Sequence, residues 1–387
     1  MGASIFRRGG YGLVAAAVLV TAGCGGSTAS SRPAAPDPVT AALTALVGPD
    51  IPGAQAVLHG PDGQRTATAG AADLATGAPY DEHAHFRIGS VTKSFVATVV
   101  LQLAAEGAVD PEAPIARYLP EVVAGNGNDG TRITVHQLLQ HTSGLADFAP
   151  EDPSHKLPQQ LDQTGDGKAY RDLTAADVVG IAMSMPPQFE PGARFEYTNT
   201  NYALLELLIE HLTGHPLATE IGSRILDHLG LHDTYFPAAG DTGMRAPYAH
   251  GYRSVDGRQV DVTEMEVAWA GAAGAIVSTG ADLTRFFAAL LSGKLLPAAQ
   301  LAQMQQTMPM PSSPDMDYGL GLIRFRMACG ADGKDIKDFW GHAGGIPGFI
   351  TLALATPRGT AVSLSINTEQ ANDRFPAALT TVACAIA

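Results

Sequence analysis

Short apolar runs of the length of β-strands lie near both ends of the chain, and longer helical patterns lie between them. Pro61-Asp62-Gly63 and Pro357-Arg358-Gly359 are turn sequences that separate neighbouring runs. The predicted strands cover 53–59, 65–70, 85–88, 318–325, 348–355 and 360–366. We therefore expect a sheet to which both ends of the chain contribute.

The middle of the chain carries apolar residues among good helix formers. The stretch 91–106 is apolar on nearly all sides and ends at Gly107, so we expect a buried helix there. The predicted helices cover 39–47, 91–106, 134–140, 174–183, 202–212, 282–291 and 374–387. These elements predict an α/β (α+β) fold, with a sheet subdomain of about 39–89 and 292–387 and a helical subdomain of about 90–291. A cleft between two such parts is a usual place for a site.

The first residues have the pattern of an export signal. Arg7 and Arg8 precede the apolar run 11–20, which is too short to span a bilayer. Thr21-Ala22-Gly23-Cys24 then resembles the cleavage site of a bacterial lipoprotein, in which Cys24 receives the lipid. An ordinary secretory signal with an incidental cysteine is the alternative. We expect a signal peptide over 1–23, a Gly/Ser/Pro-rich tether over 24–38 and one large domain over 39–387, held by its lipid at the outer face of the bacterial cell membrane.

Export changes the interpretation of the two remaining cysteines, Cys329 and Cys384. Outside the cytoplasm they can form a disulfide, which we expect; two buried free thiols are the alternative.

Composition excludes several classes of function. The chain has 387 residues, 45% of them hydrophobic and 16% charged, as a globular protein does. The net charge of −14, without any cluster of Lys and Arg, argues against a nucleic-acid partner. No phosphate-binding loop occurs, and His83 and His85 lack a third ligand at a clear spacing, so we expect no cofactor and no metal.

Three short motifs carry the candidate chemistry. Ser90 and Lys93 stand three residues apart at the start of the predicted helix, so the amine can reach the hydroxyl and act as its base. Tyr197-Thr198-Asn199 adds a phenol that can accept a proton and an amide that can bind a carbonyl group. In His342-Ala343-Gly344-Gly345 the glycines Gly344 and Gly345 allow a ligand to approach the backbone closely. Each motif alone has an ordinary structural explanation, but the three in this order are much less expected by chance.

In this order the motifs resemble those of the penicillin-recognising serine hydrolases, in the branch of class C β-lactamases, D-alanyl-D-alanine carboxypeptidases and related esterases. The stretches 86–93, 133–139, 141–145 and 318–322 add to the resemblance, which covers roughly 40–387. It implies a β-lactamase/transpeptidase-like fold, in which helices flank an antiparallel sheet and an all-helical domain is inserted.

The resemblance also implies the role of each residue. Ser90 would be the acylated nucleophile, and Lys93 and Tyr197 would share proton transfer, with the choice of base left open. Asn199 would hold the substrate carbonyl, and His342 would replace the more usual lysine of the third motif. The backbone N–H groups of Ser90 and Gly345 would stabilise the oxyanion. Phe148 and Trp269 are candidate aromatics of the cleft wall, with core packing as the alternative.

The third motif departs from the pattern of members that bind a C-terminal carboxylate. Those members tend to carry hydroxyl residues there and a nearby arginine, whereas this chain has Ala343 and Gly345. Arg324 or Arg326 could supply the charge, and both would lie on one strand face.

These observations predict an exported serine hydrolase that acts through a Ser90 acyl-enzyme on amide, ester or β-lactam bonds. A D-alanyl-D-alanine carboxypeptidase-like or β-lactamase-like activity on a small molecule or peptide is expected. The alternatives are a carboxylesterase of the same fold and, from another class, an envelope lipoprotein that binds β-lactams or muropeptides with little turnover.

Overall fold

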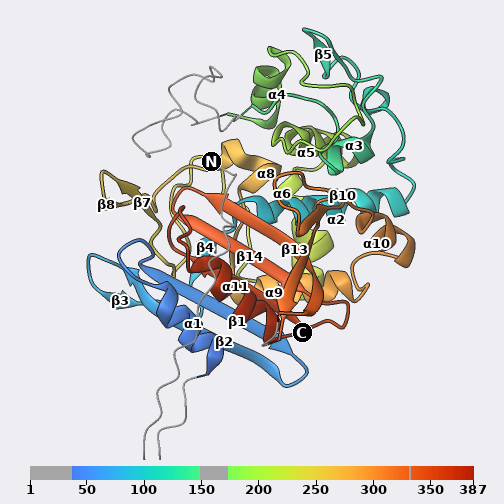
Figure 1. Ribbon diagram of the computed structural model, residues 1–387. Coiled ribbons are helices and arrows are strands. Elements are labelled where there is room, and N and C mark those ends of the chain that lie inside the picture. The colour runs from blue at the N-terminus through green and yellow to red at the C-terminus, as the bar shows by residue number, and fades with distance from the viewer. Residues whose placement is uncertain (1–36, 149–172, 331–332) are drawn as a thin grey trace, which may run out of the picture.

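The computed structural model of the chain describes residues 37–148, 173–330 and 333–387 (Figure 1). The expected signal peptide, Cys24 and nearly all of the tether lie outside the described residues. Within the described ranges, no helix is long and apolar enough to cross a membrane.

The centre of the molecule is a nine-stranded antiparallel sheet with the strand order β10-β11-β12-β13-β14-β15-β1-β2-β3. Its strands are β1 (Gly53–Gly60), β2 (Gly63–Asp73), β3 (Ala78–Pro79), β10 (Met308–Pro309), β11 (Met316–Tyr318), β12 (Ile323–Cys329), β13 (Asp335–Ile346), β14 (Phe349–Ala355) and β15 (Ala361–Ile366). The first strand pairs with the last, with Ala54 opposite Ile366. Both ends of the chain therefore build one sheet, and the expected fold class is confirmed.

Both faces of the central strands are covered, which explains why β1, β14 and β15 are buried nearly throughout without strict alternation. The helices α1 (Pro38–Leu46) and α11 (Phe375–Cys384) pack on one face, where Ala54, Ala56 and Leu58 of β1 contribute to the core (Figure 1). The helix α9 (Gly280–Leu291) packs on the other face against β1, β14 and β15, although it lies inside the range assigned to the helical part. A disulfide joins Cys329 of β12 to Cys384 of α11, as expected from the sequence.

The helical part lies at one end of this sheet, and α2 (Thr92–Ala105) connects the two (Figure 1). Most side chains of α2 are buried, as its all-round apolar sequence predicts. The other helices are α3 (Val135–Leu139), α4 (Ala175–Met183), α5 (Thr200–Thr213), α6 (Leu217–Ile221), α7 (Asp227–Leu229), α8 (Gly271–Gly274) and α10 (Ala298–Met304). Capping boxes at Thr134 and Thr174 begin α3 and α4, because each threonine oxygen accepts a backbone N–H that would otherwise lack a partner.

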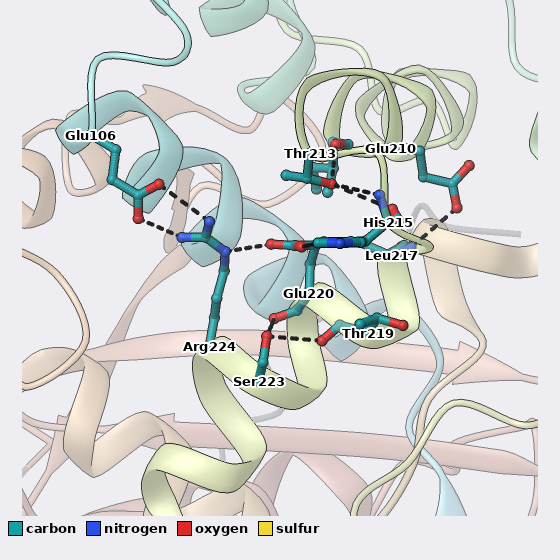
Figure 2. A network of polar contacts seen from close by, with 10 residues as sticks. Glu106, Glu210, Thr213, His215, Leu217, Thr219, Glu220, Ser223 and Arg224 are labelled. Atoms are coloured by element: carbon teal, nitrogen blue, oxygen red, sulfur yellow. Dashed lines mark hydrogen bonds and ion pairs between the residues drawn. The ribbon is translucent and has the colours of Figure 1, made fainter.

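A polar network fixes the end of α2 to the helices beyond α5 (Figure 2). Arg224 bonds Glu106 at the end of α2 (2.5 Å) and Glu220 of α6 (2.6 Å). Glu220 is only 5% exposed, and His215 contacts its other oxygen at 2.8 Å. This buried carboxylate therefore has a partner on each oxygen, which offsets the cost of removing it from water.

One predicted strand is wrong in its extent. The run 318–325 forms the end of β11, a turn and the start of β12, because Gly321 adopts a positive φ of 65° and packs against α2. The pattern also does not reveal that β13 begins at Asp335, nor the hairpin of β7 (Tyr252–Val255) and β8 (Arg258–Asp261). The short strands β4 (His85–Arg87) and β9 (Val277–Thr279) pair with each other outside the main sheet.

Candidate active site

Ser90 lies in a single 3₁₀ turn, Gly89–Val91, that connects β4 to α2. The approach to this turn is held rigidly, because one Nη of the buried Arg87 donates to the carbonyl groups of Thr242, Thr263 and Met265 at 2.8–3.1 Å. Gly89 has a φ of 51°, and a Cβ there would lie 2.7 Å from the carbonyl oxygen of Gly345. Glycine is therefore required one residue before the nucleophile.

Lys93 is completely buried, and its Nζ has three partners. It lies 3.1 Å from Ser90 Oγ, 2.9 Å from Asn199 Oδ1 and 2.7 Å from the carbonyl oxygen of Ala273. Burial lowers the pKa of Lys93 to about 7, and the nearby carboxylate of Asp147 opposes this shift. Near neutral pH a large fraction of the amine is therefore uncharged and able to accept the serine proton.

Tyr197 reaches the same serine from the other side. Its hydroxyl donates to Ser90 Oγ at 2.8 Å, and Lys93 Nζ lies 4.9 Å from the centre of its ring. Two titratable groups therefore converge on the oxygen of Ser90, the candidate nucleophile, as the resemblance implies. This arrangement can move a proton away from Ser90 and return it to a leaving group.

Asn199 links this pair to an acidic residue. Its Oδ1 accepts from Lys93, and its Nδ2 donates to Asp147 Oδ2 at 3.1 Å. An amide nitrogen carries two protons, so the second one can bind a substrate carbonyl. Asp147 had no role in the sequence interpretation, although it directly precedes the candidate Phe148 and follows the stretch 141–145 that supported the resemblance.

The glycines of the third motif lie on an open edge of β13. β12 pairs with β13 only as far as Gly341, whereas β14 continues to pair up to Ile346. A Cβ on Gly344 would lie 2.0 Å from the carbonyl oxygen of Ile88 and 3.0 Å from the nitrogen of Ser90, so this edge lies directly against the turn of the nucleophile. Gly345, in contrast, is exposed, with no atom near the position of a Cβ.

The ring of His342 is buried, and both of its nitrogens face protein groups. The ring is 1% exposed, its Nε2 lies 3.0 Å from the Tyr318 hydroxyl, and its Nδ1 lies 2.5 Å from the Ala343 carbonyl oxygen. Burial and the neighbouring Lys93 lower the pKa of His342 to about 3. At neutral pH the ring is therefore uncharged, and it does not supply the positive charge that a lysine would bring.

The two candidate aromatics differ in burial. Phe148 is 2% exposed and belongs to the main hydrophobic core, in agreement with the core-packing alternative. Trp269 is half-buried and packs against the same core. In the ranges that the structure describes, no group of three or more His, Cys, Asp and Glu side chains could hold a metal ion.

Comparison with known proteins shows the family to which the chain belongs. The family model described as Beta-lactamase matches residues 39–386. A D-stereospecific amidohydrolase from Streptomyces sp. has a similar structure, with 36% identity and a TM-score of 0.80 over 91% of this chain and 100% of that one. A D-amino acid amidase from Ochrobactrum anthropi SV3 is 28% identical, with a TM-score of 0.76 over 90% of this chain and 98% of that one.

Among curated proteins, the esterase EstB of Burkholderia gladioli is 34% identical over 203 residues. This match covers 50% of this chain and 50% of EstB, so the chain spans about half the length of that relative. Penicillin-binding protein 4 of Amycolatopsis lactamdurans is 28% identical over 66% of this chain and 65% of its own length. With the ordered motifs assembled around Ser90 and a family model that matches nearly all of the described domain, this chain belongs to the β-lactamase family of serine hydrolases.

Proposed function

We propose that the protein hydrolyses amide and ester bonds of small amino-acid derivatives that have a free amino group, through an acyl-enzyme on Ser90. Ser90 Oγ attacks the carbonyl carbon of the substrate. Its proton passes to the uncharged Lys93, either directly or by way of the Tyr197 hydroxyl. The backbone N–H groups of Ser90 and Gly345 stabilise the oxyanion. The proton then moves to the leaving amine or alcohol, and water releases the acid from Ser90.

The observation that carries this proposal is the position of Asp147. Its carboxylate lies next to Asn199, within the electrostatic reach of Lys93. A substrate whose carbonyl group is bound by Asn199 can place a positively charged amino group near this carboxylate. The similarity to a D-stereospecific amidohydrolase and a D-amino acid amidase supports amides of D-amino acids as the first substrates to test.

Binding of a substrate carboxylate by Arg324 or Arg326 has less support. Arg324 and Arg326 lie on the same face of β12, as strand alternation predicts, and both bond the carboxylate of Asp317 on β11. Both guanidinium groups are thus already engaged by one carboxylate, which leaves a net charge of one, and positions 343 and 345 lack hydroxyl groups. These features favour amides and esters over the carboxylate-terminated D-alanyl-D-alanine peptides expected from the motifs.

The test compares residues 37–387 with the Ser90→Ala variant on matched substrates. We expect Ser90-dependent release of ammonia from D-amino acid amides, weaker activity on N-acetylated versions and little on D-alanyl-D-alanine peptides. Equal rates with and without the N-acetyl group would contradict the role of the free amine. A burst of acyl-enzyme without steady turnover would favour the binding lipoprotein instead.

A carboxylesterase is the second candidate, and the match to EstB supports it. Short-chain aryl esters without an amino group separate the two activities. If kcat/KM for such esters exceeds that for every amino-acid amide and ester, the esterase assignment replaces the amidase one.

We also propose that the chain is exported and attached by a lipid on Cys24 to the outer face of the bacterial cell membrane. The Cys329–Cys384 disulfide supports an oxidising compartment. Fractionation and intact mass of the full chain beside Cys24→Ala test the anchor: we expect a diacylated membrane form and a released variant. Equal membrane retention of both would contradict the lipid.

A further inference from the structure

A chain of hydrogen bonds runs underneath the site from His141 to His342. The Tyr318 hydroxyl lies 3.1 Å from His141 Nε2 and 3.0 Å from His342 Nε2. The three side chains come from different segments, the turn after α3, the end of β11 and the open part of β13, and none is more than 1% exposed. Buried from water, these polar groups have only protein groups as hydrogen-bond partners, and the Tyr202 hydroxyl is a further partner of Tyr318.

The outer nitrogen of each histidine determines the direction of the chain. His342 Nδ1 faces the carbonyl oxygen of Ala343, which can only accept, so Nδ1 carries the proton and Nε2 is the acceptor. His141 Nδ1 receives the backbone N–H of Thr198 at 3.2 Å, so it has no proton and Nε2 is the donor. His141 therefore donates to the Tyr318 oxygen, and the Tyr318 hydroxyl donates to His342.

Asn201 supports this assignment independently. Its Oδ1 accepts a hydrogen bond from Ser143 Oγ at 2.6 Å, so its Nδ2 is the atom that faces His141 Nδ1 at 3.2 Å. A second donor at this nitrogen fits only an imidazole with an unprotonated Nδ1.

The surroundings keep both rings uncharged. When Lys93 is protonated, its positive charge also disfavours a second proton on either ring. The rings of Phe195, Tyr197 and Tyr202 cover other faces of His141, and burial lowers the pKa of both histidines.

At the His141 end, the hydrogen-bond chain holds the segment that carries Tyr197. The backbone N–H of Glu196 donates to the His141 carbonyl oxygen at 2.9 Å, and the N–H of Thr198 donates to the His141 ring. Tyr197 is thus held through both of its neighbours, and its ring lies over that of His141, with the centres 4.2 Å apart. His141 itself has a φ of 59°, a conformation that a non-glycine residue rarely adopts.

At the His342 end, the hydrogen-bond chain reaches β13, the strand beside Ser90. His342 and Ala343 directly precede Gly344, whose backbone lies against Ile88 and Ser90. The chain therefore joins the turn that carries Tyr197 to the strand edge that borders the nucleophile.

We propose that His141, Tyr318 and His342 form one directed hydrogen-bond chain, with both histidines neutral, that positions Tyr197 and the Gly344–Gly345 edge relative to Ser90. Tyr318 and His141 are positioning residues in this proposal, and His342 acts from beneath the site instead of as a charged group on the substrate. Only the kinetic part of the test rests on the proposed function.

The direct test is ¹⁵N NMR of the protein with labelled histidine, in which imidazole shifts distinguish the two neutral tautomers and the charged form. We expect His141 as the Nε2–H tautomer and His342 as the Nδ1–H tautomer, both unchanged between about pH 5 and pH 8. His141→Gln and His342→Gln identify the two signals, and Tyr318→Phe should shift both. A charged ring or a reversed tautomer at either histidine would contradict the proposed hydrogen-bond chain, whatever the substrate of the enzyme is.

The kinetic test measures how fast a fluorophosphonate probe labels Ser90. Tyr318→Phe should lower the maximal labelling rate about 10- to 100-fold, the scale of a misplaced catalytic group, while the half-saturating concentration stays the same. Adding His141→Gln should cause little further loss, because either change breaks the same chain.

Tyr80→Phe is the matched control, since Tyr80 is also buried and its hydroxyl bonds Ser365 at 3.3 Å within the sheet. If Tyr318→Phe labels as fast as Tyr80→Phe, Tyr318 does not position the site. If the probe does not label the unaltered protein at all, the proposed function fails. The NMR result still shows whether the hydrogen-bond chain exists.

Discussion

The Nζ of Lys93 donates to the carbonyl oxygen of Ala273 at 2.7 Å, so a backbone group of α8 fixes the amine beside Ser90. A buried lysine is costly as an ammonium ion, and this hydrogen bond together with the one to Asn199 Oδ1 partly offsets that cost. The amine is thereby held in place while its affinity for a proton is reduced. Lys93 is well suited to exchange a proton with Ser90 near neutral pH.

The acylation rate is expected to rise with pH through about 7, the pKa of Lys93, and to level off above it. The lysine must be uncharged to accept the serine proton, so below this pH the rate should fall about tenfold per pH unit. The pH profile of kcat/KM, or of probe labelling, measures this. A rate that falls across the same range would assign the base to Tyr197, with Lys93 acting as a cation.

Lys93→Arg should reduce acylation by about 10²- to 10⁴-fold, because arginine stays charged and cannot take up the proton. Lys294→Arg, at an exposed position, is the control and should behave as the unaltered protein. A loss of less than a few-fold would exclude Lys93 from proton transfer.

Tyr197→Phe removes the hydroxyl that lies 2.8 Å from Ser90 Oγ. Acylation or deacylation should slow by about 10²- to 10⁴-fold, with the fold retained. Stopped-flow measurement of both steps shows which one depends on the phenol. Tyr118→Phe, which changes a hydroxyl that bonds Asp110, serves for comparison. If the acylation and deacylation rates of the two variants lie within a few-fold of each other, Tyr197 has no role in proton transfer.

Two neighbouring glycines should respond differently to the same substitution. In Gly344→Ala the new Cβ would lie 2.0 Å from the Ile88 carbonyl oxygen, so the strand edge must move away from Ser90 and labelling should be lost. In Gly345→Ala the Cβ meets open space, and the backbone N–H is kept, so labelling should persist. Circular dichroism confirms that both variants fold. Equal labelling of the two would contradict the close packing of β13 on the turn of the nucleophile.

Glu206 predicts a pH dependence of stability. Burial raises the pKa of Glu206 to about 7, although its Oε2 accepts the Ala272 N–H at 2.7 Å. Between about pH 4.5 and 7 the folded state binds more protons than the unfolded state, so the free energy of unfolding falls as pH rises. Glu206→Gln keeps an acceptor without a charge and should be more stable at pH 8 by on the order of 1–3 kcal/mol.

Denaturant unfolding at pH 4.5 and pH 8 tests this, with the exposed Glu264→Gln as the control. The gain should largely disappear at the lower pH, where Glu206 is protonated in the folded state and about half protonated in the unfolded state. A gain of equal size at both values would show that the charge of Glu206 is not its cause.

Loss of the disulfide should destabilise the sheet part. Cys329 and Cys384 are 55 residues apart, and closing such a loop stabilises the folded state by about 4 kcal/mol in the chain-entropy model. The Cys329→Ser/Cys384→Ser variant should therefore unfold at a clearly lower denaturant concentration than the unaltered protein. Reductant should lower the unfolding midpoint of the unaltered protein and leave that of the variant unchanged. A parent that is insensitive to reductant would show that the bridge does not form.

The sequence reveals those parts of the site that depend on local spacing. Ser90 and Lys93 meet because positions i and i+3 share a helix face, and α2 is recognisable from its apolar residues alone. Tyr197 joins them over more than 100 residues, and only the ordered resemblance could indicate that.

Other parts depend on contacts that no local pattern encodes. The partner of Lys93 at Ala273 is a backbone carbonyl group, which any residue could provide. Arg324 and Arg326 meet Asp317 only through the register of β11 on β12, so their availability to a substrate could not be judged from spacing. His342 matched a motif, but its neutral state follows from burial beneath Tyr318.

The pairing of β1 with β15 has a consequence for the time at which the protein can fold. Ala54 needs Ile366 as its neighbour, so the sheet cannot be completed until β15 has been synthesised. Contacts between such distant segments make folding slow, because a long loop must be closed before they form. The sheet of the nascent chain thus stays incomplete while the chain emerges from the ribosome, and an incompletely folded chain is the form that the export proposed above would require.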